Sequence, residues 1–387
     1  MANNQNLGKA KREKFAEYYT QYPDIEREMQ EYISYNKDVF RDKTILLPCD
    51  DPDWSNFTRF FVFNFKFLGL KKLISTSYAP DAKKKEYELP IDFSHENPND
   101  PKFDATKWQT HGKIFVLERG ISEKEEIDIN ALQWEYLEGD GDFRSQEVTK
   151  LRDEADFIIT NPPFPLFHSF WKWLLDSGKQ FSVIGNMNAI TYKEVFPTLQ
   201  ENKAWIGGTG FQNDMVFRVP KGTYIKESDR KKAEKLGYPG DYTRLGNSCW
   251  YTNIDYKRHH EPMKGLMTME DNRRYSRHKS YIPYRKYDNY DAIDVKYSDM
   301  IPSDYYGVMG VSLSFLDKYC PEQFKIIWCG GDIEWATTKC TFFTPPSKEN
   351  KDKYKKQDKT WRVQNPYFID DKGNVETVYQ RLFIQRI

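Results

Sequence analysis

The sequence predicts an α/β protein built on a doubly wound sheet. In the first half of the chain, short runs of apolar, β-branched and aromatic residues alternate with segments of helical periodicity. Strands that read as continuous apolar runs are buried on both faces, which is typical of parallel sheets covered by helices. Because right-handed crossovers join parallel strands, helices are expected on both sides of this sheet.

The expected elements follow one another along the first 190 residues. Apolar residues at helical spacing predict a helix over about 14–37, and "TILLPCDD" at 44–51 predicts a buried strand. "NFTRFFVFNFKFLG" at 56–69 predicts an aromatic helix that ends at Gly69. The remaining elements are a helix at 166–178 and strands at 71–78, 113–120, 131–143, 153–160 and 180–190.

Polar residues mark the ends of four of these strands. In sheets of this kind, ligands bind at the carboxyl ends of the strands. The strand ends that carry polar or acidic side chains are 50–51, 140–143, 161–164 and 186–188. We therefore expect these four segments to converge on one edge of the sheet.

The formal net charge is zero, but the charge is unevenly distributed. Residues 1–160 carry 23 basic and 31 acidic side chains, whereas residues 218–290 carry 17 and 9. A polyanionic partner would explain this distribution, and so would a solvated charged face, which is the commoner case. The five scattered cysteines form no zinc-type spacing, so no metal site is predicted, and they are typical of a reducing cytoplasm. The polar N-terminus predicts no signal peptide, and no apolar run is long enough for a membrane span.

Beyond about residue 245 the sequence changes in character. The stretch 273–291 interleaves basic residues with tyrosines, and its candidates for phosphate or base-edge contacts are Arg273, Arg274, Arg277 and Lys279. Residues 308–330 predict a strand, a short helix and a second strand. Residues 348–359 are expected to form a charged loop, and a strand is expected at the end of the chain.

The strand at 153–160 runs directly into Asn161-Pro162-Pro163-Phe164. Because proline lacks an N–H donor and has a fixed φ, the Asn161 side-chain oxygen and the Pro162 carbonyl can face the same point. Two such acceptors suit the two hydrogens of an exocyclic amino group, and holding both N–H bonds frees the nitrogen lone pair for attack. Phe164 offers a flat face to a heterocycle. This arrangement predicts methyl transfer from a sulfonium donor, rather than a turn that only ends a strand.

The tetrapeptide resembles the catalytic motif of amino-methyltransferases that depend on S-adenosylmethionine, and its Asn-Pro-Pro-Phe form is similar to the adenine-N6 DNA branch. Nearly the whole chain resembles the EcoRI-type adenine-specific DNA methyltransferases. The similar segments include "EYYTQYPDIEREM", "CDDPDWSNFTRFF", "GDGDFRS", "TNPPFPLF", "GNMNAITYKEVF" and "GVSLSFLDKYCPEQFKI". The resemblance implies a Rossmann-like methyltransferase sheet followed by a C-terminal target-recognition region.

The resemblance also implies roles for individual residues. The catalytic residues implied are Asn161, Pro162, Pro163 and Phe164. The contacts implied for S-adenosylmethionine are Tyr19, Thr20, Asp50, Asp51, Pro52, Asp140, Asp142 and Phe143. Of these, Asp142 and Phe143 match the pair that holds the donor's adenine. The residues implied to line the target-base pocket are Asn186 and Asn188.

Two features depart from the general methyltransferase pattern. The segment after the strand at 44–51 contains no glycine, and the strand at 71–78 is followed by no acid that could bind the cofactor ribose. These departures motivate one alternative, a catalytically inactive DNA-binding module with a decayed cofactor site. The other alternative is methylation of a different amino acceptor, such as cytosine N4, an RNA adenine or a glutamine amide.

The sequence therefore predicts a site-specific DNA adenine-N6 methyltransferase. Its catalytic domain is expected over 13–260 and its DNA target-recognition region over 261–387. The target adenine must be flipped out of the duplex to reach the catalytic residues. The expected partner is double-stranded DNA, with a monomeric enzyme in the cytoplasm and a cognate restriction endonuclease encoded alongside. A phage-borne or orphan enzyme is the alternative setting.

Overall fold

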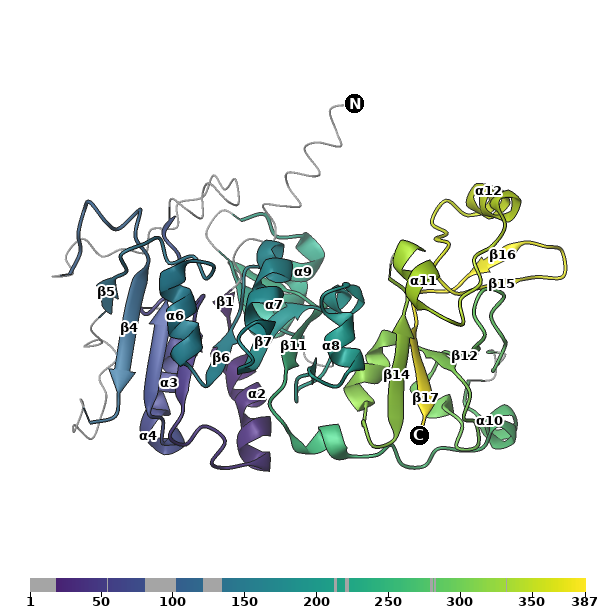
Figure 1. Ribbon diagram of the computed structural model, residues 1–387, viewed down its shortest axis with the longest axis horizontal. Coiled ribbons are helices and arrows are strands. Elements are labelled where there is room, and N and C mark those ends of the chain that lie inside the picture. The colour runs from purple at the N-terminus through teal and green to yellow at the C-terminus, as the bar shows by residue number, and fades with distance from the viewer. Residues whose placement is uncertain are drawn as a thin grey trace. The chain divides into compact units, whose positions relative to one another are not determined.

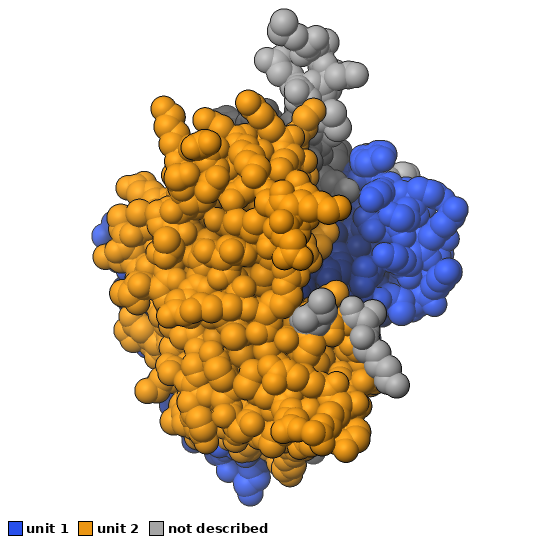
Figure 2. All heavy atoms as spheres, turned by 90° about the vertical axis from the view of Figure 1, so that its right-hand side faces the viewer, with its two compact units in different colours: residues 1–187, 206–256 blue, residues 188–205, 257–387 orange. Residues whose placement is uncertain are grey.

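A computed structural model of the chain describes residues 19–53, 55–80, 102–120, 134–211, 214–219, 223–278, 281, 283–331 and 333–387. The chain divides into two compact units, which are coloured separately in Figure 2. The first unit contains residues 1–187 and 206–256, and the second contains residues 188–205 and 257–387.

The first unit is built on an eight-stranded sheet with the order β5-β4-β3-β2-β6-β7-β11-β8 (Figure 1). Its strands are β2 (Thr44–Leu47), β3 (Lys72–Thr76), β4 (Lys113–Glu118), β5 (Trp134–Tyr136), β6 (Phe157–Thr160), β7 (Gln180–Asn186), β8 (Trp205–Ile206) and β11 (Ser248–Thr252). Every residue of β2 and β6 is buried, because these apolar strands lie in the middle of the sheet. The α/β class predicted from the sequence is confirmed.

The direction of the strands differs from the expectation near the edges of the sheet. β3, β2, β6 and β7 run parallel to one another, as predicted. However, β4 runs antiparallel to β3, and β11 runs antiparallel to β7, so the sheet is mixed and the expectation of a wholly parallel sheet is wrong there. An apolar run shows that a strand is buried, but it does not show which way the strand runs.

The first unit also contains several helices. They are α2 (Tyr22–Tyr35), α3 (Asn56–Phe63), α4 (Phe65–Leu68), α6 (Gln146–Glu154), α7 (Phe167–Leu175) and α9 (Glu227–Lys235). In Figure 1, α6 and α7 lie in front of the sheet and α3 lies behind it. The predicted end of the aromatic segment is confirmed, because Gly69 caps α4 in the left-handed conformation with φ 62°.

A small antiparallel sheet completes the first unit. It pairs β1 (Tyr19–Thr20), β9 (Val216–Arg218) and β10 (Tyr242–Arg244) in the order β1-β9-β10. The helix predicted over 14–37 begins only at Tyr22, and residues 14–18 lie outside the described ranges. Pairing with β9 explains why Tyr19 and Thr20 are extended.

The second unit contains a four-stranded sheet with the order β12-β13-β17-β14. Its strands are β12 (Ile293–Val295), β13 (Met309–Val311), β14 (Phe324–Cys329) and β17 (Leu382–Arg386), and a separate hairpin joins β15 (Tyr367–Ile369) to β16 (Val375–Thr377). The helices are α8 (Phe196–Gln200), α10 (Met269–Tyr275), α11 (Ile333–Lys339) and α12 (Lys348–Gln357). The 3-10 helices of the described chain are η2 (Phe164–Leu166), η3 (Met187–Thr191), η4 (Lys257–His260), η5 (Ser298–Met300) and η6 (Leu313–Lys318).

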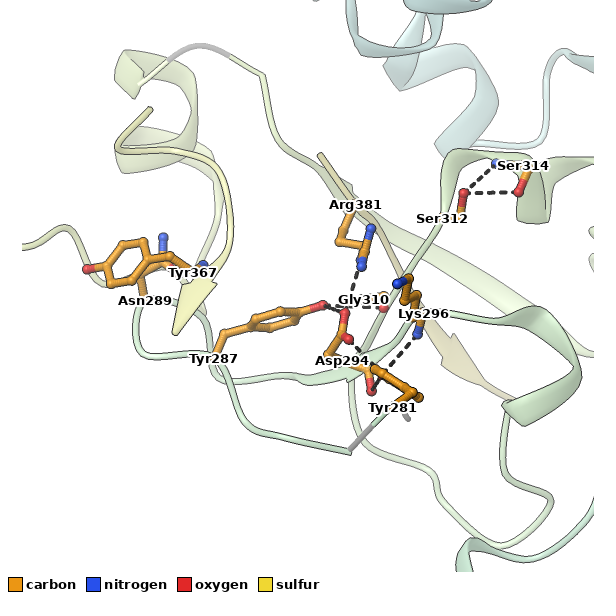
Figure 3. Close-up of polar contacts among 10 residues, drawn as sticks. All are labelled: Tyr281, Tyr287, Asn289, Asp294, Lys296, Gly310, Ser312, Ser314, Tyr367 and Arg381. Atoms are coloured by element: carbon orange, nitrogen blue, oxygen red, sulfur yellow. Dashed lines mark hydrogen bonds and ion pairs between the residues drawn. The ribbon is translucent and has the colours of Figure 1, made fainter. Parts of the chain in front are cut away.

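A buried ion pair links two strands of this second sheet (Figure 3). Arg381, just before β17, donates to the Asp294 carboxylate in β12 at 3.0 Å, and both side chains are less than 10% exposed. The hydroxyls of Tyr287 and Tyr281 donate to the same carboxylate at 2.5 and 2.6 Å. A buried charge pair is tolerated when its remaining hydrogen-bonding capacity is satisfied, as it is here.

The prediction of a charged loop at 348–359 is wrong, because most of this segment is helix α12. The side chain of Ser347 caps the helix by accepting a hydrogen bond from the Asn350 amide. The segment shows little amphipathic pattern because only Tyr354 is buried. The expected strand at the end of the chain is confirmed as β17. Among the described helices, none is long and apolar enough to span a bilayer.

Candidate active site

The carboxyl ends of the parallel strands bring the predicted segments to one edge of the first unit's sheet. β2, β6 and β7 run in the same direction and are followed by Asp50, Asn161 and Met187. β5 runs in this direction too, since it is antiparallel to β4 and β4 is antiparallel to β3. The segments 50–52, 140–143, 161–164 and the end of β7 therefore share an edge, as the sequence indicates.

The tetrapeptide forms a bend between β6 and α7. Asn161 is half-buried directly after the fully buried β6, and Pro162 is buried. Pro163 has φ −59° and ψ 120°, and its carbonyl accepts a hydrogen bond of 3.0 Å from the Leu166 amide. Phe164 opens the 3-10 helix η2 and is half-buried. The prolines thus end the strand and start a helical turn in place of continuing the sheet.

Asp50 joins three elements beneath this bend. Its carboxylate accepts a hydrogen bond of 2.6 Å from the hydroxyl of Thr160, the last residue of β6. It accepts a second one, of 2.7 Å, from the hydroxyl of Ser55. Ser55 is also the N-cap of α3 and accepts from the Phe57 amide. The Asp50 amide donates to the Thr76 carbonyl at the end of β3. The sequence predicts that Asp50 belongs to the site, but it does not predict that Thr160 and Ser55 are its hydrogen-bond partners.

The environment of Asp50 favours its neutral form. Burial raises the pKa of the Asp50 carboxyl to about 7, and the negative charge of Asp51 raises it as well. The hydrogen bonds from Thr160 and Ser55 act in the opposite direction. Because the side chain is buried and both carboxylate oxygens have protein partners, Asp50 is suited to positioning the surrounding segments.

The residues that follow Asp50 form a short capped turn. The half-buried Asp51 carboxylate accepts from the Asp53 amide at 2.9 Å, and Pro52 is buried. Asp53 forms an ion pair of 2.6 Å with Lys113 of β4. Lys113 is only 5% exposed and its ammonium lies 4.1 Å from the centre of the Trp134 ring. A buried lysine of this kind needs an acidic partner, and no signal in the sequence pairs it with Asp53.

The turn at Asp140 lies against the segment that follows β3. The Asp140 carbonyl accepts a hydrogen bond of 2.7 Å from the Ala79 amide. Gly141 has φ 78°, and a Cβ at this position would overlap the Ser77 carbonyl oxygen. Gly141 is therefore required here both for a left-handed backbone and for close approach of two loops.

Asp142 and Phe143 already have protein partners. The Asp142 carboxylate accepts from the Arg144 guanidinium at 2.5 to 3.1 Å. The Phe143 ring is buried and meets the rings of Phe170 and Trp173 in α7 edge-on, at centroid distances of 5.1 and 5.6 Å. Asp142 and Phe143 therefore lie on the predicted edge of the sheet. The Asp142 carboxylate is bonded to Arg144, and the Phe143 ring lies within the core.

The extended segment Tyr19–Thr20 is joined to the first turn of α3. The Asn56 side-chain amide donates a hydrogen bond of 2.8 Å to the Thr20 carbonyl. Since Asn56 follows the N-cap Ser55, this bond places β1 near the Asp50 segment, as the cofactor prediction requires. Thr20 itself is buried and Tyr19 is half-buried.

The two asparagines predicted for the target-base pocket belong to different units. Asn186 ends β7, pairs with Ser248 in β11, and its carbonyl accepts 2.8 Å from the Tyr251 hydroxyl. Asn188 belongs to the second unit, and its carbonyl accepts 2.9 Å from the Thr191 hydroxyl. The structure therefore keeps only Asn186 on the same unit as Asn161.

Most of the predicted DNA-contacting cations lie in or just after α10. Arg273 is exposed, with its guanidinium 5.5 Å from the centre of the Tyr284 ring. Arg274 forms an ion pair with Glu270, and Arg277 forms one of 3.1 Å with Asp299. Lys279 lies outside the described residues. The described chain contains no group of three His, Cys, Asp or Glu side chains that could hold a metal ion.

Comparison with known proteins identifies the family. A family model described as "Adenine-specific methyltransferase EcoRI" matches residues 6–386. The chain belongs to this family. The EcoRI-type methyltransferase described here is 38% identical to the Type II methyltransferase M.EcoRI of Escherichia coli, over 84% of its own chain and 89% of that protein. No solved structure matches it.

Two mycoplasma proteins are also similar to this EcoRI-type methyltransferase. The Type II methyltransferase M.MpnI of Mycoplasma pneumoniae is 32% identical, over 84% of this chain and 85% of the relative. M.MgeORF184P of Mycoplasma genitalium is 32% identical over 84% and 86%. The predicted family and the predicted activity, a site-specific DNA adenine methyltransferase of restriction–modification, are thereby confirmed. The inactive-module and other-acceptor alternatives lose their support.

Proposed function

We propose that the enzyme transfers a methyl group to adenine N6 at the bend formed by Asn161, Pro162, Pro163 and Phe164. The observation that carries this proposal is the position of the bend. It directly follows a buried parallel strand, on the edge of the sheet that also carries Asp50 and Asp142. Ligands of open α/β sheets bind at this edge.

The bend suits an amino group as the acceptor of the methyl group. The Asn161 side-chain oxygen and the Pro162 carbonyl accept the two N–H bonds of the target amine, which leaves its lone pair free to attack. Phe164 stacks on the purine ring. The transition state needs no general base, because the amine is neutral before attack and its extra proton leaves to water afterwards.

The chemistry of the edge fits S-adenosylmethionine. Such a ligand carries a sulfonium, an ammonium, a carboxylate and ribose hydroxyls, and the acidic side chains of the edge match its positive charges and its hydroxyl donors. When bound, S-adenosylmethionine supplies an electrophilic methyl group. We assign its contacts to Tyr19, Thr20, Asp51 and Pro52 on one side and to Asp140, Asp142 and Phe143 on the other. We place Asp50 beneath these contacts, where it positions them.

We further propose that the mixed sheet is the Rossmann-like methyltransferase sheet, with the catalytic domain over 13–260 and target recognition over 261–387. The central parallel order β3-β2-β6-β7, with helices on both faces, supports the first assignment. Exposed cations such as Arg273 support the second, with Asn186 and Asn188 at the target base. We expect a monomer that acts on duplex DNA in the cytoplasm, with a cognate endonuclease as its natural companion.

A tritium-transfer assay tests this proposal. The wild-type enzyme should move label from S-adenosylmethionine to duplex DNA, and nucleoside analysis should yield N6-methyladenine. Asn161→Ala should abolish turnover while duplex binding is retained, and Phe164→Ala should lower turnover less completely. Full activity of Asn161→Ala, or label on cytosine, would refute the assigned role.

A further inference from the structure

Helix α12 is a lysine-rich element of the second unit. Its residue Tyr354 is 3% exposed and forms a small hydrophobic cluster with Trp361 and Tyr367, with ring centroids 5.6 to 5.9 Å apart. Because aromatic pairs of this geometry stabilise a cluster beyond the area they bury, α12 has an anchor of its own. The helix is therefore held in one orientation against the rest of this cluster.

Polar contacts bind α12 to the β15–β16 hairpin as well. The Val375 amide donates 3.0 Å to the Gln357 side chain, and the Thr377 hydroxyl donates 2.6 Å to Asp358, the C-cap of the helix. Hydrogen bonds from Thr360 and from the Thr377 hydroxyl lower the pKa of the Asp358 carboxyl to about 2, so it remains ionised and engaged with these partners. In Figure 1, α12 lies beside this hairpin at the periphery of the second unit.

The outward surface of α12 carries a net positive charge. Residues 348–359 include six lysines and three acids, a net charge of +3, and five of the six lysines are exposed. Within the described ranges, none of these lysines lies within 4.0 Å of a carboxylate. By contrast, Arg274 and Arg277, which the sequence indicates for DNA contact, are paired with acids.

Three of the lysines share one flank of the helix. Lys348, Lys351 and Lys355 are spaced i, i+3 and i+7, so their side chains project from the same side. Lys355 also donates to the carbonyls of Lys359 and Trp361, which are neutral acceptors and leave its charge in place. The three cations form a row, and we call them the α12 lysine row.

We propose that the α12 lysine row contacts the phosphate backbone of the DNA substrate. This inference rests on the proposed function, which makes duplex DNA the partner. Lysine is a compact point charge that binds phosphate without the bidentate geometry arginine uses to read bases. The row should therefore contribute affinity that is independent of DNA sequence and sensitive to salt.

The test is the salt dependence of DNA binding. Fluorescence anisotropy would give the Kd for a labelled random-sequence duplex at several KCl concentrations, for the wild type and for Lys348→Gln/Lys351→Gln/Lys355→Gln. Each lost phosphate contact lowers the slope of log K against log[salt] by about 0.9, so we expect a decrease of about 3. The substitutions should raise the Kd by the same factor for duplexes that contain the sequence methylated by the enzyme as for random-sequence duplexes.

A second variant avoids the helix terminus. Because Lys355 bonds carbonyls beyond the end of α12, its loss can disturb the helix as well as the charge. Lys348→Gln/Lys351→Gln leaves that contact intact and should lower the slope by about 2, with an unchanged thermal unfolding midpoint. An unchanged slope in this folded double variant would overturn the proposal.

A matched control separates the position of the charges from their number. Lys318→Gln/Lys325→Gln/Lys339→Gln removes three exposed lysines from other elements of the second unit. The control should keep the wild-type slope, and an equal decrease in both triple variants would show only an effect of net charge. At saturating DNA the α12 variants should retain wild-type turnover, whereas failure of methyl transfer in the wild type would refute the proposed function and not the α12 contact.

Discussion

Asp50 and Thr160, 110 residues apart in the sequence, are joined by a hydrogen bond of 2.6 Å between a buried carboxylate and the hydroxyl that immediately precedes Asn161. The same carboxylate receives the hydroxyl of Ser55 at the start of α3. A single side chain thus connects the loop after β2 with the bend after β6. A disturbance at Asp50 should therefore reach Asn161 through one residue.

Thr160→Val should lower turnover more than it weakens binding. Valine keeps the shape of threonine but leaves a buried oxygen of Asp50 without its partner, which costs about 1–3 kcal/mol of stability. We expect kcat to fall at least tenfold with little change in the KM for DNA, because the bend moves while the binding surfaces remain. Steady-state kinetics and urea unfolding would measure the two effects.

Ser55→Ala is the control for this prediction. It removes the other hydroxyl from the Asp50 carboxylate, which costs about 1–3 kcal/mol, and the N-cap of α3, which costs about 1 kcal/mol more. If Thr160→Val and Ser55→Ala lower kcat equally, the effect is one of general stability. The role of Thr160 in positioning Asn161 would then be wrong.

Asp50→Asn should change how stability depends on pH. The folded protein raises the pKa of Asp50 to about 7, so it binds this proton more tightly than the unfolded chain does. The contribution of the Asp50 carboxyl to the free energy of unfolding is therefore greatest at low pH, and it is lost as the pH rises from about 4 to about 7. Asparagine does not titrate, so the free energy of unfolding of Asp50→Asn relative to wild type should rise by about 2–3 kcal/mol between pH 5 and pH 8. A difference that stays constant across this range would contradict the prediction.

Arg144→Gln should strengthen cofactor binding if Asp142 holds the donor's adenine. The Arg144–Asp142 ion pair is partly exposed, so its removal should cost less than about 1 kcal/mol of stability. The substitution frees the Asp142 carboxylate from the guanidinium, while the hydrogen bond from the backbone amide of residue 144 remains. The Kd for S-adenosylmethionine should therefore fall by up to about fivefold. Calorimetry would measure this, with Asp142→Asn as the opposite control. An unchanged Kd in Arg144→Gln, beside a raised Kd in Asp142→Asn, would show that the ion pair does not compete.

Gly141→Ala should disrupt the turn formed by residues 139–142. Gly141 combines a positive φ with contact to the Ser77 carbonyl, whereas Gly178 has φ 64° and no atom within 4 Å of the point that a Cβ would occupy. Gly178→Ala should therefore lower the free energy of unfolding by about 1–2 kcal/mol, through backbone strain alone. Gly141→Ala should lower it by clearly more, because the new Cβ also meets the Ser77 carbonyl. Thermal unfolding of the two variants gives the comparison, and equal losses would mean that the loops separate easily.

Much of the first unit could be predicted because its signals are local. β2, β6 and β7 are short apolar runs, and the bend at Asn161 carries its own rigid prolines. Polar residues after parallel strands meet at one edge for geometric reasons, so the grouping of Asp50 with Asn161 follows from the strand pattern. The family resemblance rested on the same local segments.

The unpredicted parts depend on contacts between distant residues or on single anchors. The pairing of Lys113 with Asp53, and of Asp50 with Thr160, leaves no periodic trace in the sequence. Helix α12 resembles a loop because one buried residue, Tyr354, replaces the usual apolar stripe. The direction of β4 is likewise invisible in its apolar pattern.

The second unit is assembled from two separate stretches of chain. Phe196 of α8 meets the rings of Trp328 and Trp335 at 6.0 and 5.7 Å, and Trp205 stacks on His259 at 4.3 Å. A fragment that begins at residue 261 would lack Phe196, Trp205 and His259, so Trp328 and Trp335 would each lose the Phe196 ring as a neighbour. Anyone who transplants the second unit between relatives must therefore move residues 188–205 together with residues 257–387, as a two-piece graft.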